Sequence, residues 1–386
     1  MKKIWRMALL ASILALLTSA AWDQYATPEF AKADKAFRYV WGDYVDVQLL
    51  MNTDDGLLQL LALRQGEMQM KMGSSFVPMW KVIGLWHAYQ NANKAWVSNG
   101  VVADLTSPLV EQAQAANPLA SVFFVAPQLA AACDAGGRLH AVLTDKGEGE
   151  KRFVYAVRDT DMNWHVMYSN PIADSLAEPF GLPAGGSQMT MLALVQGGEN
   201  DGRIARYALS PSLGGGRDTF RWTRELFPEG LKAASFAALQ DNQTFILFLQ
   251  GQGGGSVQAA DRDLAAGRWN LDPQRFEPSI PRDLSKIAPK NMVGFLGGDG
   301  LPQVVALQAG GGAQVVVHLY RDEIGLWHNN GTIFNVQNFK RISACPDANG
   351  YINLSGVGLD GRIWHGYRGD AQEWKSNGFI FDQNSR

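Results

Sequence analysis

Charged residues are scarce in this sequence, and neither sign is in clear excess. They make up 18% of the chain and leave a formal net charge of −3 at pH 7. Nucleic acids and anionic lipid surfaces attract proteins through clustered lysine and arginine. The lack of a basic surplus therefore excludes nucleic acid from the expected partners and argues against an anionic membrane surface.

Metal-binding and phosphate-binding motifs are missing. The histidines and cysteines show no His-x-x-His, Cys-x-x-Cys or His-Glu-x-x-His spacing. The acidic stretch at 53–56 lacks the ladder of Asp and Asn that a calcium loop needs, so it predicts a turn. Glycine-rich stretches at 214–216, 251–255 and 310–312 are not followed by the Lys-Ser/Thr of a phosphate loop. We therefore expect no metal and no cofactor.

Cysteine is nearly absent, with only Cys133 and Cys345 in the chain. Each stands shortly before a glycine turn, at Gly137 and Gly350, so the two occupy matching places in a repeat. An oxidising compartment favours pairing of two lone cysteines. Matching places on distant repeats, however, lie farther apart than the roughly 7 Å that a disulfide allows between Cα atoms. Unpaired thiols are the expectation, with a disulfide as the alternative.

Long apolar runs are absent except at the start of the chain. A cationic segment at 2–6 precedes an apolar run at 7–17, and the small residues Thr-Ser-Ala-Ala follow at 18–21. The run is shorter than the roughly 20 residues that cross a bilayer. The sequence thus predicts a signal peptide at 1–21 and a periplasmic or extracellular mature protein, residues 22–386, with no membrane span.

Glycine and tryptophan, by contrast, are abundant, with 41 and 12 residues respectively. Many glycines and few charges suit short strands joined by tight turns. Six turn pairs, which tolerate the positive φ of hairpins, separate apolar runs. They are Asp55-Gly56, Gly136-Gly137, Asp201-Gly202, Asp241-Asn242, Asp299-Gly300 and Asn349-Gly350. The composition predicts an all-β protein.

The clearest internal repeat joins the two ends of the chain. Trp-His-x-Tyr followed by Trp-x-Ser-Asn-Gly occurs at 86–100 and again at 364–378, with identical spacing. Two further Trp-His pairs are Trp164-His165 and Trp327-His328. An Arg-Asp pair also precedes several tryptophans, as Arg158-Asp159 precedes Trp164, which indicates strand, turn and a second strand that carries tryptophan.

Six tryptophans mark the predicted repeats. They are Trp86, Trp164, Trp222, Trp269, Trp327 and Trp364. Two successive hairpins around each make a four-stranded antiparallel unit, and such units close into a β-propeller because stacked blades bury their faces and edges. We predict a single domain of about six blades, with seven as the alternative.

Three segments affect this blade count. A seventh blade would lie around 101–130, where 121–125 is strand-like. Helical stretches are expected at Pro28–Lys35 and as an insertion at Leu109–Ala116.

The repeat resembles the sugar-binding β-propeller lectins of bacteria and fungi, including those that bind fucose. The resemblance covers the two ends well and the middle loosely. It implies shallow pockets between blades, where an aromatic platform and polar side chains hold a sugar. The matching positions are Trp86, His87, Tyr89, Trp96, Trp364, His365, Tyr367 and Trp374. Thr223 and Asn270 replace the histidine after Trp222 and Trp269, so at most three or four sites are expected.

The tryptophans at these positions have two interpretations. An aromatic face stacks on the C–H face of a sugar, but large aromatic side chains are more often core. We expect the first tryptophan of each repeat to be core. Trp96 and Trp374, each followed by Ser-Asn-Gly within a polar loop, fit a platform and a core residue equally.

Three functions fit the sequence. The first is a lectin whose partner is a glycan or glycoconjugate. The second is a non-catalytic scaffold for an envelope or secreted protein complex. The third is a sialidase-like glycosidase, since 322–327 partly matches an Asp box, although its glycine comes one place late. No catalytic residue can be assigned, because carboxylates that converge in space are not visible in sequence order, and an enzyme is the less favoured reading.

Overall fold

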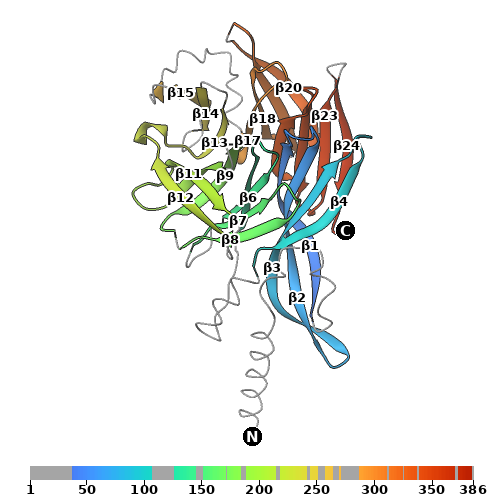
Figure 1. Ribbon diagram of the computed structural model, residues 1–386. Coiled ribbons are helices and arrows are strands. Elements are labelled where there is room, and N and C mark those ends of the chain that lie inside the picture. The colour runs from blue at the N-terminus through green and yellow to red at the C-terminus, as the bar shows by residue number, and fades with distance from the viewer. Residues whose placement is uncertain are drawn as a thin grey trace.

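The computed structural model describes residues 37–106, 126–144, 151–170, 172–183, 188–213, 218–240, 244–250, 257–263, 269–270, 287–310, 313–324, 326–336, 339–369 and 373–384. Within these residues the chain forms six four-stranded antiparallel sheets, each built from four consecutive strands (Figure 1). The predicted all-β propeller is confirmed. The sheets are called blades 1 to 6 in chain order.

The strands follow the chain without crossovers. Blade 1 comprises β1 (Phe37–Met51), β2 (Leu58–Met72), β3 (Ser75–Gln90) and β4 (Trp96–Asp104). Blade 2 comprises β5 (Gln128–Cys133), β6 (Leu139–Thr144), β7 (Val154–Arg158) and β8 (Trp164–Tyr168). Blade 3 comprises β9 (Ser175–Pro183), β10 (Met189–Gln196), β11 (Ile204–Ser212) and β12 (Thr219–Leu226), and a 3-10 turn, η3 (Glu229–Leu231), follows it.

The second half of the chain repeats this order. Blade 4 comprises β13 (Ser235–Gln240), β14 (Thr244–Gln250), β15 (Val257–Asp263) and β16 (Trp269–Asn270). Blade 5 comprises β17 (Ile287–Leu296), β18 (Pro302–Gly310), β19 (Ala313–Arg321) and β20 (Trp327–Val336). Blade 6 comprises β21 (Phe339–Pro346), β22 (Ile352–Gly358), β23 (Ile363–Arg368) and β24 (Trp374–Phe381).

The hairpins form where the turn pairs predict them. Gly350 joins β21 to β22 with a φ of 79°, which L-residues with side chains rarely adopt. The Asp347 carboxylate accepts hydrogen bonds from the backbone N–H groups of Asn349 and Tyr351 and holds the turn closed. A Cβ on Gly350 would lie 2.7 Å from the Cα of Gly298 on the neighbouring blade. Glycine here also lets two blades approach each other.

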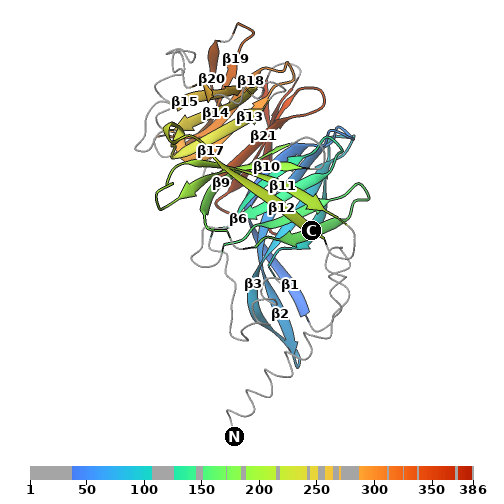
Figure 2. The same cartoon turned by 60° about the vertical axis from the view of Figure 1, so that its left-hand side comes forward.

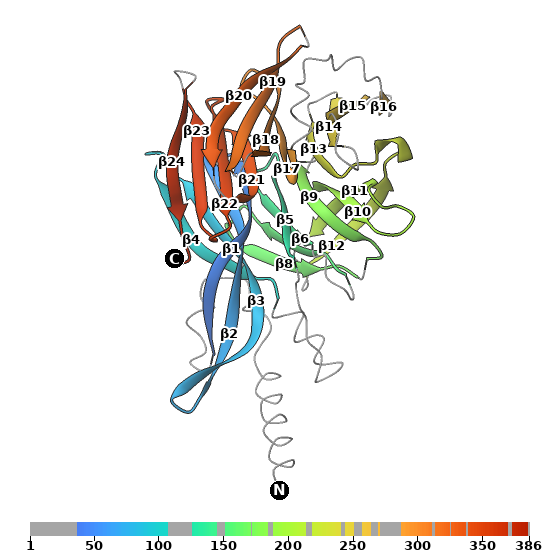
Figure 3. The same cartoon turned by 180° about the vertical axis from the view of Figure 1, so that it is seen from behind.

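The first strand of every blade lies innermost, and these six strands form a closed ring. Each packs against the next, and β21 of blade 6 packs against β1 of blade 1 (Figures 2 and 3). Side chains join the inner strands: the Asp46 carboxylate accepts a hydrogen bond from Leu129 N (2.8 Å) and lies 3.4 Å from Arg341 Nε. Ser343 Oγ accepts one from Leu49 N.

The described residues form six blades, and β1 contacts β5 directly, so no sheet of described residues lies between blades 1 and 2. Residues 101–104 belong to β4 and residues 128–130 to β5, so the described ends of the segment 101–130 are parts of blades 1 and 2 and not of a seventh blade. The strand-like segment 121–125 lies outside the described residues. So do the predicted signal peptide and the helical stretches Pro28–Lys35 and Leu109–Ala116. No helix in the described part of the chain is long and apolar enough to span a membrane.

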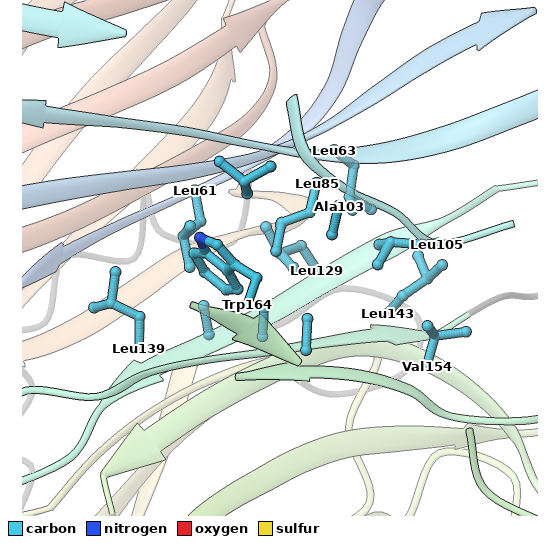
Figure 4. Packing of buried hydrophobic residues seen from close by; sticks show 14 of the residues in the cluster. Leu61, Leu63, Leu85, Ala103, Leu105, Leu129, Leu139, Leu143, Val154 and Trp164 are labelled. Carbon is cyan, nitrogen blue, oxygen red and sulfur yellow. The ribbon is translucent and has the colours of Figure 1, made fainter. Parts of the chain in front are cut away.

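The hydrophobic core is divided among the six boundaries between neighbouring blades. At the boundary of blades 1 and 2, Leu61 and Leu85 meet Leu129 and Trp164 (Figure 4). Equivalent clusters fill the other five boundaries. Each fully buried side chain of this size contributes about 1.5–3 kcal/mol. A blade is therefore stable only while both neighbours cover it.

Blade 1 also carries a three-stranded arm that projects beyond the ring (Figures 1 and 3). Register places Tyr39, Met68 and Trp80 side by side on one face of the arm. A Cβ on either Gly66 or Gly84 would lie 2.6 Å from the Trp41 ring. The two glycines thus make room for this tryptophan at the base of the arm.

Candidate functional site

The repeated tryptophans occupy two different places in a blade, which corrects the alignment of the repeat. Trp86 and Trp364 lie on third strands, β3 and β23, whereas Trp164, Trp269 and Trp327 begin fourth strands. The equivalent positions in blades 1 and 6 are occupied by Trp96 and Trp374, which also begin fourth strands. The Trp-His pair is thus not one motif, because Trp86-His87 and Trp164-His165 sit on different strands.

A second repeat emerges once the strands are aligned. A third-strand His-x-Tyr is followed, on the fourth strand, by Trp-x-x-Asn-Gly in blades 1, 5 and 6. The three sets are His87, Tyr89, Trp96 and Asn99; His318, Tyr320, Trp327 and Asn330; and His365, Tyr367, Trp374 and Asn377. His318, Tyr320 and Asn330 were missed in the sequence, although identical spacing was a signal that could have found them.

Each of these histidines is the centre of a buried hydrogen-bond network. His87 Nδ1 lies 2.9 Å from the Asn99 amide nitrogen, and Nε2 lies 2.8 Å from the Gln59 amide oxygen. Because an amide nitrogen only donates, Nδ1 accepts and Nε2 carries the proton. The imidazole is therefore held neutral in one tautomer.

The other two networks repeat this geometry. His318 bonds Asn330 and Gln303 at 2.8 and 2.9 Å. His365 bonds Asn377 and Asn353 at 2.9 and 3.2 Å.

Burial depresses the basicity of all three rings. It lowers the pKa of His87 and of His318 to about 3, with Arg158 and Arg368 respectively adding to the effect, and that of His365 to about 4. A neutral ring at physiological pH follows. These histidines are therefore uncharged near pH 7, and Nδ1 of each accepts a hydrogen bond from the asparagine amide beside it.

The networks sit on the boundaries between blades, here called seams. The Trp164 ring of blade 2 lies 6.0 Å from His87 of blade 1, edge to face. Trp374 lies 5.4 Å from His318, and Trp96 lies 5.2 Å from His365. Seams 1/2, 5/6 and 6/1 thus each combine a histidine unit from one blade with a tryptophan from the next.

A tyrosine and one further polar residue complete each seam. The rings of Tyr89, Tyr320 and Tyr367 stack beside their histidines at centroid distances of 6.5, 6.1 and 6.1 Å and are half-buried. The next blade supplies the residue directly opposite its tryptophan in the strand register. These residues are Arg158 at seam 1/2, Arg368 at seam 5/6 and Gln90 at seam 6/1.

The structure separates the eight sequence-predicted residues. Trp86, with no exposed surface, packs against Tyr44 and Phe381. Trp364, 7% exposed, packs against Phe334. Both rings are core, as expected for the first tryptophan, and neither presents a face to a ligand.

The remaining six predicted residues are distributed over all three seams. His87 and Tyr89 lie at seam 1/2, and Trp374 lies at seam 5/6. His365, Tyr367 and Trp96 meet at seam 6/1, so the two end repeats contribute to a shared site. Trp96 and Trp374 are half-buried.

The other two Trp-His pairs make a different contact. His165 Nε2 lies 2.7 Å from Asp159, and Nδ1 lies 2.6 Å from Asp218 on blade 3. His328 lies 2.6 Å from Asp322 within blade 5. No cluster of three or more metal-ligating side chains occurs in the described residues, and both cysteines are free.

Comparison with solved structures shows proteins of the same architecture. AofleA of Arthrobotrys oligospora, as an arginine-to-alanine mutant, is 12% identical with a TM-score of 0.53 over 92% of this chain and 94% of its own. Aleuria aurantia lectin, a six-bladed β-propeller, is 11% identical with a TM-score of 0.52 over 89% and 97%. The chain shares the fold of these propellers.

SapL1 lectin, solved in complex with α-methyl fucoside, also has a similar structure. It is 12% identical with a TM-score of 0.52 over 90% of this chain and 98% of its own. No protein-family model and no curated protein sequence matches the chain. At these identities the likeness extends to the fold. The seam residues must therefore be judged on their own chemistry.

Proposed function

We propose that the protein is an exported, lectin-like propeller that holds sugars at seams 1/2, 5/6 and 6/1. The observation that carries this proposal is the threefold recurrence of one polar and aromatic unit at blade boundaries. A need for packing alone does not explain the repetition, because a fourth-strand tryptophan at a blade boundary also packs without a histidine unit. Trp327, for example, packs against Phe248 at the boundary of blades 4 and 5.

The unit has the groups that sugar recognition requires. The half-buried rings of Tyr89 and Tyr367 offer a face for the C–H side of a pyranose, whereas at seam 5/6 the His328 ring already stacks on Tyr320 at 5.0 Å. The exposed asparagine of each seam offers an amide for the sugar hydroxyls. The buried histidine holds that amide in place through Nδ1. A polar group that is already ordered loses less conformational entropy when a ligand binds.

Two further points support the proposal. Aleuria aurantia lectin and SapL1, which share the fold, were solved with α-methyl fucosides. The chain also begins with the signal-peptide pattern at 1–21, which fits a protein that meets glycans outside the cytoplasm. We infer that the mature chain starts near residue 22, and N-terminal mass analysis of the exported protein tests this.

The proposal predicts that loss of the seam tyrosines lowers the affinity for sugar more than it lowers the stability of the fold. In a glycan array and in titrations, replacing Tyr89, Tyr320 and Tyr367 with Ala should weaken binding roughly 2- to 12-fold per site, since an aromatic contact contributes about 0.5–1.5 kcal/mol. The control is Met72→Ala, which changes an exposed side chain at the tip of the blade 1 arm. It should bind like wild type.

Three outcomes separate the candidate functions. Binding lost in the tyrosine variant and kept in the control supports the lectin. No glycan bound at high protein concentration contradicts it and favours the scaffold. Cleavage of a chromogenic glycoside would show an enzyme instead.

A further inference from the structure

Among the described residues, seam 1/2 contains a buried cation without a partner. Arg158 ends β7, is only 4% exposed, and stands opposite Trp164 in the strand register. Its Nε is completely buried and unsatisfied, and its guanidinium makes no hydrogen bond or ion pair within the described residues. A charge taken out of water without a partner is unfavourable for folding. Its retention at this seam points to a ligand that supplies the missing negative charge.

The two carboxylates that act electrostatically on Arg158, those of Asp55 and Asp159, accept hydrogen bonds from other groups. Asp159 accepts hydrogen bonds from His165 and from Asn163 N. Asp55 accepts one from Leu57 N within its own turn. Burial lowers the pKa of Arg158, while Asp55, Cys133 and Asp159 act in the opposite direction. The guanidinium stays charged, because arginine does not deprotonate in proteins.

Blade 4 shows what a satisfied arginine at this position looks like. Arg262 stands opposite Trp269 just as Arg158 stands opposite Trp164. Its Nη1 lies 3.1 Å from Glu225 Oε1, which belongs to β12 of the preceding blade. A carboxylate of the chain thus fills, at the boundary of blades 3 and 4, the place that is left unpaired at seam 1/2.

We propose that seam 1/2 binds an acidic sugar and that Arg158 pairs with its carboxylate or sulfate group. This inference rests on the proposed function and names the substrate class. The planar guanidinium matches either anion with two parallel hydrogen bonds. Tyr89 and Asn99, on the blade opposite, then face the sugar ring and its hydroxyls.

The three seams are not equivalent under this proposal. Seam 5/6 carries Arg368, half-buried, with its guanidinium 5.9 Å from the Trp374 ring. Seam 6/1 carries Gln90, which is 6% exposed and uncharged. The chain therefore contains its own neutral version of the site, and Arg158→Gln converts seam 1/2 to it.

The decisive test compares matched sugars on matched variants. Wild type, Arg158→Gln and Arg158→Lys are titrated with methyl glucuronide against methyl glucoside, and with N-acetylglucosamine 6-sulfate against N-acetylglucosamine. Arg158→Gln should lose at least about tenfold more affinity for an acidic sugar than it loses for the matched neutral sugar, since charge-assisted bonds are the stronger kind. Arg158→Lys should lose less affinity for the acidic sugar than Arg158→Gln, because lysine keeps the positive charge. The preferred acidic sugar identifies carboxylate or sulfate.

Thermal melting supplies a readout that needs no sugar. Without ligand, Arg158→Gln should melt at or above wild type, because it removes an unpaired buried charge. Sodium sulfate should stabilise wild type more than Arg158→Gln relative to sodium chloride of equal ionic strength. If sulfate stabilised wild type more than Arg158→Gln but no sugar bound, the proposed lectin function would be contradicted and the proposed anion site at Arg158 would be supported. Equal sulfate effects, or acidic-sugar binding unchanged in Arg158→Gln, would overturn the inference.

Discussion

At the scale of single residues, one amino acid does two jobs in this ring. Third-strand Trp86 is enclosed by Tyr44 and Phe381 in the core. Fourth-strand Trp96 is half-buried and covers His365 of the neighbouring blade. Local sequence hides the difference between third-strand and fourth-strand tryptophans, because Trp86-His87 on a third strand and Trp164-His165 on a fourth strand are both Trp-His pairs. The strand on which a tryptophan lies decides whether its ring is buried in the core or half-buried at a seam.

These two positions should differ in what their loss costs. Trp86→Ala leaves a cavity in a closed core and should lower the free energy of unfolding by about 3–5 kcal/mol. Trp96→Ala removes a ring that is only partly enclosed, so roughly half of that loss is expected. Urea unfolding of both variants measures the difference. Equal losses would mean that the fourth-strand tryptophan is core as well.

At the scale of elements, the positions of the hairpins could be predicted from the sequence, but the strands of a blade that each hairpin joins could not. Turn pairs such as Asn349-Gly350 locate hairpins because only a few residues accept a positive φ. Nothing local shows which hairpin is inner or outer, so third and fourth strands were merged into one motif. The composition of the site could not be predicted for the same reason. Seam 6/1 brings His365 of the last blade against Trp96 of the first, and the sequence does not show that these two blades are neighbours.

The outer strands of blades 2 and 3 are joined by a contact that responds to pH. Partial burial disfavours a charged His165, but hydrogen bonds to Asp159 and Asp218 outweigh it and raise the pKa of His165. Stability from a raised pKa is fully present below the unfolded value of about 6.5. It is lost as pH rises through the folded value.

Asp218→Asn should therefore destabilise the protein more at pH 5.5 than at pH 9. The loss should stay under about 1 kcal/mol, since both side chains remain about a quarter exposed, at 24% and 28%. Asp322→Asn is the comparison, because its His328 pair lies within a single blade. Melting curves at both pH values provide the measurement. A pH-independent loss for Asp218→Asn would show that charge does not drive this contact.

At the scale of the whole molecule, the candidate sites gather on one side of the ring. Seams 5/6, 6/1 and 1/2 are consecutive, and they are built by the first and last parts of the chain. The internal repeat is strongest between the two ends for the same reason. A ligand with several sugars in reach of neighbouring seams would gain affinity from binding more than one.

Ring closure predicts that the C-terminal strand is essential to the whole fold. Phe381 of β24 lies 4.7 Å from the Trp86 ring, across the seam between the last and first blades. Arg64 of β2 also donates to Gln383 O, just past that strand. Without β24, blade 6 loses its outer strand and the core cluster that it shares with blade 1 is opened. Partial loss of one blade should therefore spread around the ring.

Deleting residues 374–386 should consequently abolish cooperative unfolding and leave aggregated protein, because exposed strand edges pair with other chains. Removing only residues 385–386, past the last described residue, leaves every contact named above and should melt like wild type. Size-exclusion chromatography and thermal melts of both truncations decide the question. A longer truncation that stayed monomeric and melted in one sharp transition would mean that the blades fold independently, and that closure through Trp86 and Phe381 is not what holds this ring together.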